Sequence, residues 1–266
     1  MAEWVLITGA SSGIGLEFAR AYAAAGRDVV LCARRRDRLE AVAAEVRLLG
    51  RRAEVQELDL CRRSAPRKLA ARLAGLGIVV DTLVNNAGAM HHGPFVAQDP
   101  TQLDELLAVN VRALAGLTRA FLPGMLELKH GRILNVASVT AFQPVPSMAI
   151  YAASKAFVLS FTEALSEELR GSGVTATALC PGLTRTEMVS DLPEAVQSYL
   201  RLAPFMQGLV MQEADAVARE GMEACERGEV IRVPGVLNQM ATLWSHYQPR
   251  WLVRALGGVA GRMSLT

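Results

Sequence analysis

The opening of the chain, residues 4–33, restricts the fold more than any other segment. A short apolar run at residues 4–7 is followed by the glycine-rich stretch TGASSGIG, an amphipathic run at 16–25 and a second apolar run at 29–33. This order of strand, turn, helix and strand predicts a βαβ unit. Glycines at the turn allow backbone amides at the helix N-terminus to approach a pyrophosphate. We therefore expect half of a dinucleotide-binding site here.

Composition and charge limit the remaining possibilities. The chain has 266 residues and a net charge of +2, which gives no reason to expect nucleic-acid binding and suits one α/β domain spanning residues 1–266. The first strand begins by Trp4 and no apolar run reaches about 18 residues, so we expect neither a signal peptide nor a membrane span. The four cysteines are far apart and form no C-x-x-C pair, which favours reduced thiols and a cytoplasmic location.

A cluster of arginines follows the second predicted strand, where the adenosine ribose of a dinucleotide is held. An acidic residue at this point favours NAD, but this chain has Ala33 followed by Arg34. A guanidinium here suits a 2′-phosphate, so we assign Arg34 to NADP(H). Arg35, Arg36 and Arg38 are also consistent with the solvated start of a helix. The competing arrangement leaves Arg34 in solvent and gives the phosphate to Ser11, Ser12 or Arg35.

Polar or small residues follow the third and fourth predicted strands. Asp59 and Leu60 come after the strand at residues 53–58, where the carboxylate can accept a hydrogen bond from the adenine amine. The alternative role for Asp59 is to cap the helix that opens near Ser64. The next strand runs into NNAG at residues 85–88, whose small side chains allow a cofactor to contact the backbone.

Three polar side chains are expected to meet near the middle of the chain. Tyr151 and Lys155 are four residues apart in a stretch that favours helix, so they share one face. A cation beside a tyrosine stabilises the phenolate, and we expect the pKa of Tyr151 to be lowered toward neutrality. Ser138 follows the apolar strand at residues 133–136, which places its hydroxyl at the strand's carboxyl end.

Asn110 lies within a long predicted helix at residues 101–125. A buried asparagine must be hydrogen-bonded, so a structural role that bends the helix is one interpretation. This helix and the helix after Tyr151 are apolar enough to bury a second face against another subunit.

Taken together, these motifs resemble those of the short-chain dehydrogenase/reductase family in order and spacing, over about residues 3–235. The residues that carry the resemblance are TGASSGIG at 8–15, Asp59, NNAG at 85–88, Asn110, Ser138, YAASK at 151–155 and Pro181-Gly182. The resemblance implies an α/β, single-domain Rossmann fold: a doubly wound, seven-stranded parallel sheet with helices on both faces. It also implies a nicotinamide cofactor and a homodimer or homotetramer built on the two apolar helices.

The resemblance further implies roles for individual residues. Tyr151 is expected to be the general acid and base, Lys155 to lower its pKa and hold the nicotinamide ribose, Ser138 to position the substrate oxygen, and Asn110 to order a water in a proton relay. The segment 181–186 is expected to cross the nicotinamide end. The predicted cofactor-binding residues are Gly9, Ser11, Ser12, Gly13, Ile14, Gly15, Arg34, Asp59, Leu60, Asn86, Ala87, Gly88, Tyr151, Lys155, Pro181, Gly182, Thr184 and Thr186.

Two later segments and a histidine pair have less definite interpretations. Residues 188–212 suit a lid over an apolar substrate, with a packed helical hairpin as the alternative. The extension at 238–266 is expected to cap the cleft or contact another subunit, rather than lie on a membrane surface. His91 and His92 are adjacent in a loop without a third ligand nearby, so we expect no metal site and place them along the substrate cleft.

The sequence as a whole predicts an NADP(H)-preferring oxidoreductase that interconverts a carbonyl and a secondary alcohol on a fairly apolar small molecule. A nicotinamide-sensing protein without turnover is the alternative from another class, but the complete set of Tyr151, Lys155, Ser138 and Asn110 argues against it. A sugar-nucleotide epimerase or dehydratase shares the Tyr/Lys pair. It usually needs a larger substrate region than this chain has after Cys180.

Overall fold

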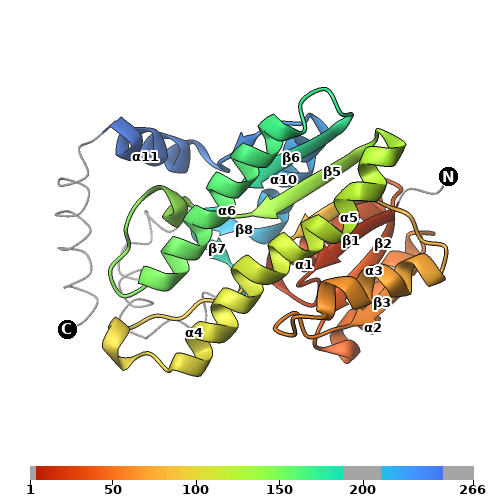
Figure 1. The fold of residues 1–266 in the computed structure, drawn as a ribbon, viewed down its shortest axis with the longest axis horizontal. Helices are drawn as coiled ribbons and strands as arrows, with labels where there is room; N and C mark the ends of the chain where they lie inside the picture. The colour runs from red at the N-terminus through yellow and green to blue at the C-terminus, as the bar shows by residue number, and fades with distance from the viewer. Residues whose placement is uncertain (1–3, 188–210, 248–266) are drawn as a thin grey trace.

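The computed structural model describes residues 4–187 and 211–247. At its centre is a seven-stranded sheet in the order β3-β2-β1-β4-β5-β6-β9, with every neighbouring pair parallel (Figure 1). This confirms the predicted Rossmann-type sheet, in which the order of the strands reverses between β1 and β4. The strands are β1 Trp4–Thr8, β2 Asp28–Ala33, β3 Ala53–Glu57, β4 Val80–Asn85, β5 Gly131–Val136, β6 Val174–Leu179 and β9 Ile231–Arg232.

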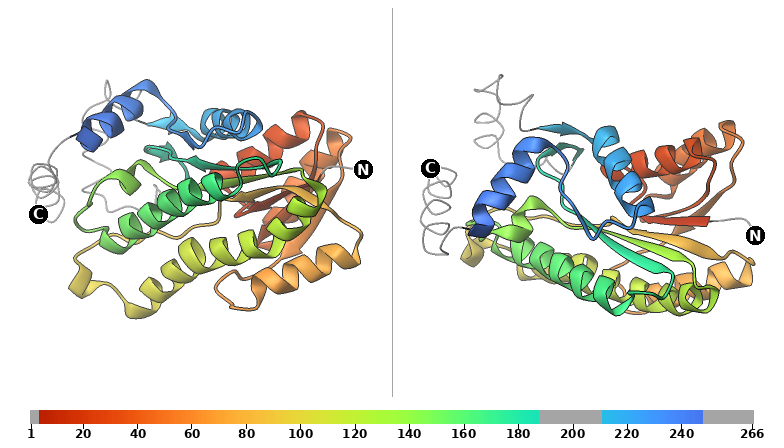
Figure 2. Two further views of the ribbon diagram at one scale, coloured as in Figure 1. Left: turned by 45° about the horizontal axis from the view of Figure 1, so that its top comes forward. Right: turned by 90° about the horizontal axis from the view of Figure 1, so that it is seen from above.

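Helices cover both faces of the sheet (Figure 2). One face carries α1 Gly13–Ala24, α2 Arg36–Leu48 and α10 Ala214–Glu226, and the other carries α3 Ala65–Gly75, α5 Leu114–Leu128 and α6 Ala149–Glu168. Side chains of a strand alternate between these faces. Val5 and Ile7 therefore pack into the core with Phe18 of α1, whereas Leu6 packs into the core with Leu69 of α3. Both faces of β1 are buried, which explains why it is a continuous apolar run.

The long helix predicted at residues 101–125 is three elements in the structure. These are α4 Pro100–Leu107, the π-helical turn η2 Ala108–Ala113 and α5. Among the described residues, Pro100–Leu128 is the one helical run long and apolar enough to cross a membrane by length and composition alone. Leu117 and Met125 of this run pack in the core beside β4 and β5, so part of its apolar surface is buried within the fold.

A second, small sheet joins β7 Thr184–Arg185 to β8 Gln212–Glu213. It was not predicted, because strands of two residues have no recognisable sequence pattern. It fixes the segment after β6 to the start of α10. Of the predicted lid, residues 188–210 lie outside the described residues. Of the predicted extension, α11 Val236–Tyr247 is described and packs against the 3-10 turn η3 Val139–Phe142, while residues 248–266 lie outside the described range.

Candidate active site

Thr8, at the end of β1, links β1 to β4, the two strands between which the strand order reverses. Its hydroxyl donates to the Val84 carbonyl at 3.2 Å and accepts from the backbone amides of Asn86 and Ala87, each at 3.0 Å. The Asn86 side chain donates back to the Thr8 carbonyl at 2.9 Å. These bonds hold the glycine turn and the NNAG segment side by side at the edge of the sheet where such folds bind ligands.

The glycines of the first turn are required by the close approach of backbones. A Cβ at Gly15 would lie 2.3 Å from the Gly9 carbonyl oxygen and 2.4 Å from the Asn86 side-chain nitrogen, so no other residue fits there. Gly9 and Gly13 have φ of +68° and +56°, a region that side chains disfavour. The turn therefore leaves a shallow cradle of backbone at the N-terminus of α1, which suits the pyrophosphate of a dinucleotide.

A cavity of about 990 Å³ runs from this turn across the carboxyl ends of the strands. Every predicted cofactor-binding and catalytic residue lines this cavity, except Gly15 and Asn110. The lining residues that were not predicted are mostly apolar. They include Met90, Val109, Val145, Met148 and Leu183.

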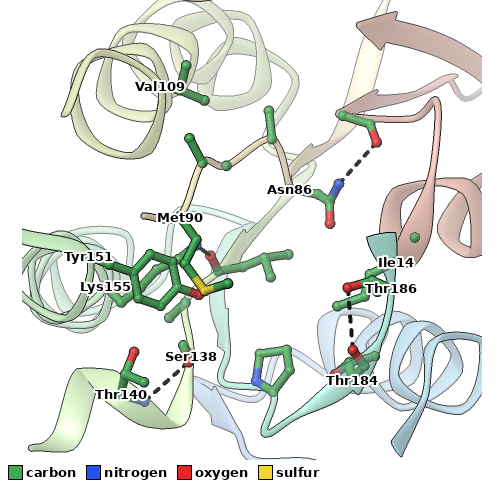
Figure 3. A pocket seen from close by; sticks show the side chains of 18 of the residues that line it. Ile14, Asn86, Met90, Val109, Ser138, Thr140, Tyr151, Lys155, Thr184 and Thr186 are labelled. Carbon is green, nitrogen blue, oxygen red and sulfur yellow. Dashed lines mark hydrogen bonds between the residues drawn. The ribbon is translucent and has the colours of Figure 1, made fainter. Parts of the chain in front are cut away.

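Ser138, Tyr151 and Lys155 come together on this cavity, as Figure 3 shows. Ser138 follows β5, and the other two lie on α6, one turn apart. Tyr151 is 9% exposed and Lys155 is 5% exposed. The Lys155 ammonium donates to the Val136 carbonyl at 2.8 Å and lies 5.7 Å from the centre of the Tyr151 ring. The last residue of β5 thus holds the ammonium near the phenol, and Ser138 follows that strand.

The expected lowering of the Tyr151 pKa is wrong for the protein without a cofactor. Burial raises the pKa of Tyr151 above its usual value, and a hydrogen bond with the Ser138 side chain opposes that effect only in part. Burial also lowers the pKa of Lys155 to about 8. Both shifts have one cause, because each charged form loses water in the buried site. At neutral pH the phenol is therefore protonated, and the ammonium is still charged.

Asn110 lies in the π-helical turn η2 and is 2% exposed. Its side-chain oxygen accepts from the Ala89 amide at 2.8 Å, and its nitrogen donates to the Ala89 carbonyl at 2.9 Å and to the Ser154 hydroxyl at 3.0 Å. The Ser154 hydroxyl in turn donates to the Tyr151 carbonyl at 2.7 Å. Asn110 thus joins the loop after β4 to the helix that carries Tyr151.

Two arginines reach the adenosine end of the cavity in different ways. Arg35 donates to the hydroxyls of Ser11 at 3.0 Å and Ser12 at 2.8 Å, and it pairs with the Glu187 carboxylate at 3.1 Å. Arg34 lines the same cavity and makes no hydrogen bond or ion pair with any described residue. Either arginine is therefore placed to contact a 2′-phosphate: Arg34 as predicted, or Arg35 as in the competing arrangement.

Asp59 does not cap α3, since no side-chain bond caps that helix. Its carboxylate instead accepts from the Cys61 amide at 3.0 Å and lines the cavity. His91 and His92 also line the cavity, as predicted, and so does Trp244 of α11. Within the described part of the chain no group of three or more potential metal ligands occurs.

Comparison with known proteins identifies relatives of this arrangement. The sequence profile of the short chain dehydrogenases matches residues 3–197. A short chain dehydrogenase of Pseudocercospora fijiensis is 42% identical over 187 residues, or 69% of this chain and 60% of the relative. The very-long-chain 3-oxoacyl-CoA reductase of Bos taurus is 35% identical over 196 residues, or 71% of this chain and 61% of the relative. The match thus spans about 60% of the length of these relatives.

A solved structure extends the likeness over almost the whole chain. The short-chain dehydrogenase from Sphingobium yanoikuyae in complex with NADPH is 33% identical, covers 97% of this chain and 95% of its own, and superposes with a TM-score of 0.78. The glycine cradle, the buried Ser138, Tyr151 and Lys155 cluster, and these matches lead to one conclusion. The chain belongs to the short-chain dehydrogenase family.

Proposed function

We propose that this protein is an NADP(H)-dependent enzyme that reduces a carbonyl to a secondary alcohol on a fairly apolar substrate. The observation that carries the proposal is the meeting of Ser138, Tyr151 and Lys155 on the same cavity as the glycine cradle. When bound, the reduced cofactor supplies a hydride. A substrate oxygen within reach of Ser138 and Tyr151 is polarised by both hydroxyls, and Tyr151 gives it a proton.

At neutral pH the protonation states suit the proton donation that reduction requires. Burial raises the pKa of Tyr151, so the phenol carries the proton that an alkoxide product needs. Lys155, with a pKa of about 8, is charged below that pH and stabilises the phenolate that remains. Asn110 and Ser154 are positioning residues in this scheme, because they hold the backbone of Tyr151 and do not line the cavity.

NADP(H) is proposed as the preferred cofactor on the basis of charge. No acidic residue directly follows β2, and Arg34 and Arg35 line the cavity there. Guanidinium groups bind phosphate through paired, charge-assisted hydrogen bonds. The structurally similar protein from Sphingobium yanoikuyae is in complex with NADPH, which agrees with the proposal.

The apolar walls of the substrate end support a long-chain or bulky carbonyl. Met90, Val145, Met148, Leu183 and Trp244 line that end of the cavity. Apolar walls with a few polar groups bind ligands mainly through buried area. Because the Bos taurus relative is a very-long-chain 3-oxoacyl-CoA reductase, 3-oxoacyl thioesters are the first class to test.

The expected single domain, cytoplasmic location and homodimer or homotetramer belong to the same proposal. Apolar side chains remain exposed on the two helices expected at the subunit interface, including Leu126 of α5 at 39% and Phe157 of α6 at 40%. Burying such a face against a second copy removes apolar area from water. Light scattering of the purified protein tests the oligomer.

The proposed reaction is tested with NADPH and a panel of carbonyls that runs from acetone to ring-bearing ketones and 3-oxoacyl thioesters of increasing length. We expect kcat/KM to rise with apolar size and the alcohol to be found by mass spectrometry. Equal or better kcat/KM for acetone would contradict the apolar substrate, and no alcohol from any member would contradict the reaction.

A further inference from the structure

A groove of about 450 Å³ lies on the outer face of the molecule, between α3 and the run formed by η2 and α5. The two helices are neighbours, as Figure 1 shows, and Gly116 allows the close contact, since a Cβ there would lie 2.9 Å from the Pro66 ring. Five arginines line the groove. They are Arg62, Arg63, Arg67, Arg112 and Arg119.

The charge of this region is one-sided. Residues 60–80 contain five basic residues, Arg62, Arg63, Arg67, Lys68 and Arg72, and no aspartate or glutamate. In α1, by contrast, Arg20 binds both Glu17 and Glu45 at 2.7 Å. An uncompensated cluster of like charges raises the local positive potential and concentrates anions.

The arginines of the groove differ in how they are held. Arg112 donates to the Cys61 carbonyl at 2.6 Å, and Arg62 lies 3.6 Å from the Asp59 carboxylate. Arg63, Arg67 and Arg119 form no ion pair or hydrogen bond with any residue in the described part of the chain. Three guanidinium groups, from Arg67 of α3, Arg119 of α5 and Arg63 just before α3, therefore line one groove without an ion pair or hydrogen bond to any described residue.

From this arrangement we propose that the groove is a second anion site, which binds a small molecule carrying two or more phosphate groups. Guanidinium forks match phosphate oxygens in pairs, and the volume suits a small ligand rather than a macromolecule. The site is distinct from the cofactor cavity, although Leu60 lines both. An occupant of the groove therefore contacts the segment that follows β3 and lies at the adenine end.

The test uses protein saturated with NADPH, so that the cofactor cavity is filled. Isothermal titration calorimetry with pyrophosphate and with adenosine 3′,5′-bisphosphate distinguishes free phosphate from a phosphorylated nucleotide. Each titration is run at low ionic strength and at about 0.15 M salt, which is close to physiological. We expect saturable binding of one probe, weakened at least about tenfold in Arg63→Gln/Arg67→Gln/Arg119→Gln. The matched control, Arg170→Gln/Arg219→Gln/Arg227→Gln, removes the same charge from exposed positions elsewhere and should bind like the unmutated protein.

Two outcomes would overturn the proposal. They are no saturable binding of either probe, or equal weakening of binding in both triple variants. Thermal unfolding of both variants shows whether they fold, and the exposed positions of all six arginines make that the expected result.

Discussion

The two ends of the cofactor cavity are built in contrasting ways. At the catalytic end Tyr151 and Lys155 are almost fully buried, and Lys155 and Asn110 each have a backbone partner. At the adenosine end Arg34 is exposed, and Arg35 shares a surface carboxylate, Glu187, with a neighbour. Burial allows one arrangement at the first end, whereas solvent allows several at the second.

This difference determines what each end can do. A side chain lost from the buried end has no alternative partner within reach, so catalysis depends on every residue there. Exposed arginines exchange partners at little cost, so the affinity for the 2′-phosphate is set by competition with Glu187 and water. The predictions below separate these two behaviours.

The largest effect is expected from Tyr151→Phe. The phenol is the proton donor in the proposed reaction, so kcat should fall by at least about 10²-fold while NADPH affinity stays within a factor of about three. Steady-state rates and a fluorescence titration measure the two quantities. Near-normal turnover in this variant would rule out Tyr151 as the acid.

A smaller effect is expected at the adenosine end. Losing a partly exposed contact between arginine and phosphate should weaken NADPH binding by roughly 10- to 150-fold and leave NADH nearly unchanged. Arg34→Ala and Arg35→Ala, titrated with both cofactors, show which arginine makes the contact. Equal affinity of the unmutated protein for the two cofactors would refute the NADP(H) preference.

Lys155→Met should make the cofactor-free protein more stable at pH 7. The pKa of Lys155 is lowered from 10.5 to about 8, so below pH 8 the lysine is charged in both the folded and unfolded states and its burial cost is fully present. After allowing for the lost bond to Val136, we expect a gain of about 2 kcal/mol in the free energy of unfolding.

The size of this effect depends on pH and on ligand. Between pH 8 and pH 10.5 the unfolded state binds more protons than the folded state, so the unmutated protein gains stability as pH rises and the advantage of the variant shrinks. Saturating NADPH should stabilise the unmutated protein more than the variant. A variant less stable than the unmutated protein at pH 7 without cofactor would show that burial of Lys155 costs little.

The smallest effect is expected from Glu187→Gln. Hydrogen bonds from Arg38 and Arg35 lower the pKa of Glu187, so its carboxylate is charged at neutral pH and competes with a phosphate for Arg35. Removing that charge should tighten NADPH binding by about two- to fivefold without changing NADH binding. An equal change in affinity for both cofactors would show that Glu187 does not compete with the 2′-phosphate for Arg35.

Features set by local sequence patterns were predicted, whereas features that depend on distant partners or on solvent were not. The period of the strands, the glycine turn and the spacing of Tyr151 and Lys155 predicted the sheet and the cluster, because these are local patterns that burial enforces. The π-helical turn at Asn110 and the pairing of β7 with β8 were not predictable, since both depend on partners far along the chain. The pKa of Tyr151 was predicted with the wrong sign, because the spacing of residues shows a neighbouring charge but not the loss of water.

The transfer of hydride from NADPH to a carbonyl carbon, completed by a proton from Tyr151, is the central claim. It is tested most directly by a single turnover with NADPH dideuterated at C4 and the best ketone of the panel. The account predicts one deuterium on the carbinol carbon of the product, and product formation in Tyr151→Phe slower by at least about 10²-fold with the cofactor still bound. An alcohol without deuterium, or equal rates in the two proteins, would contradict it.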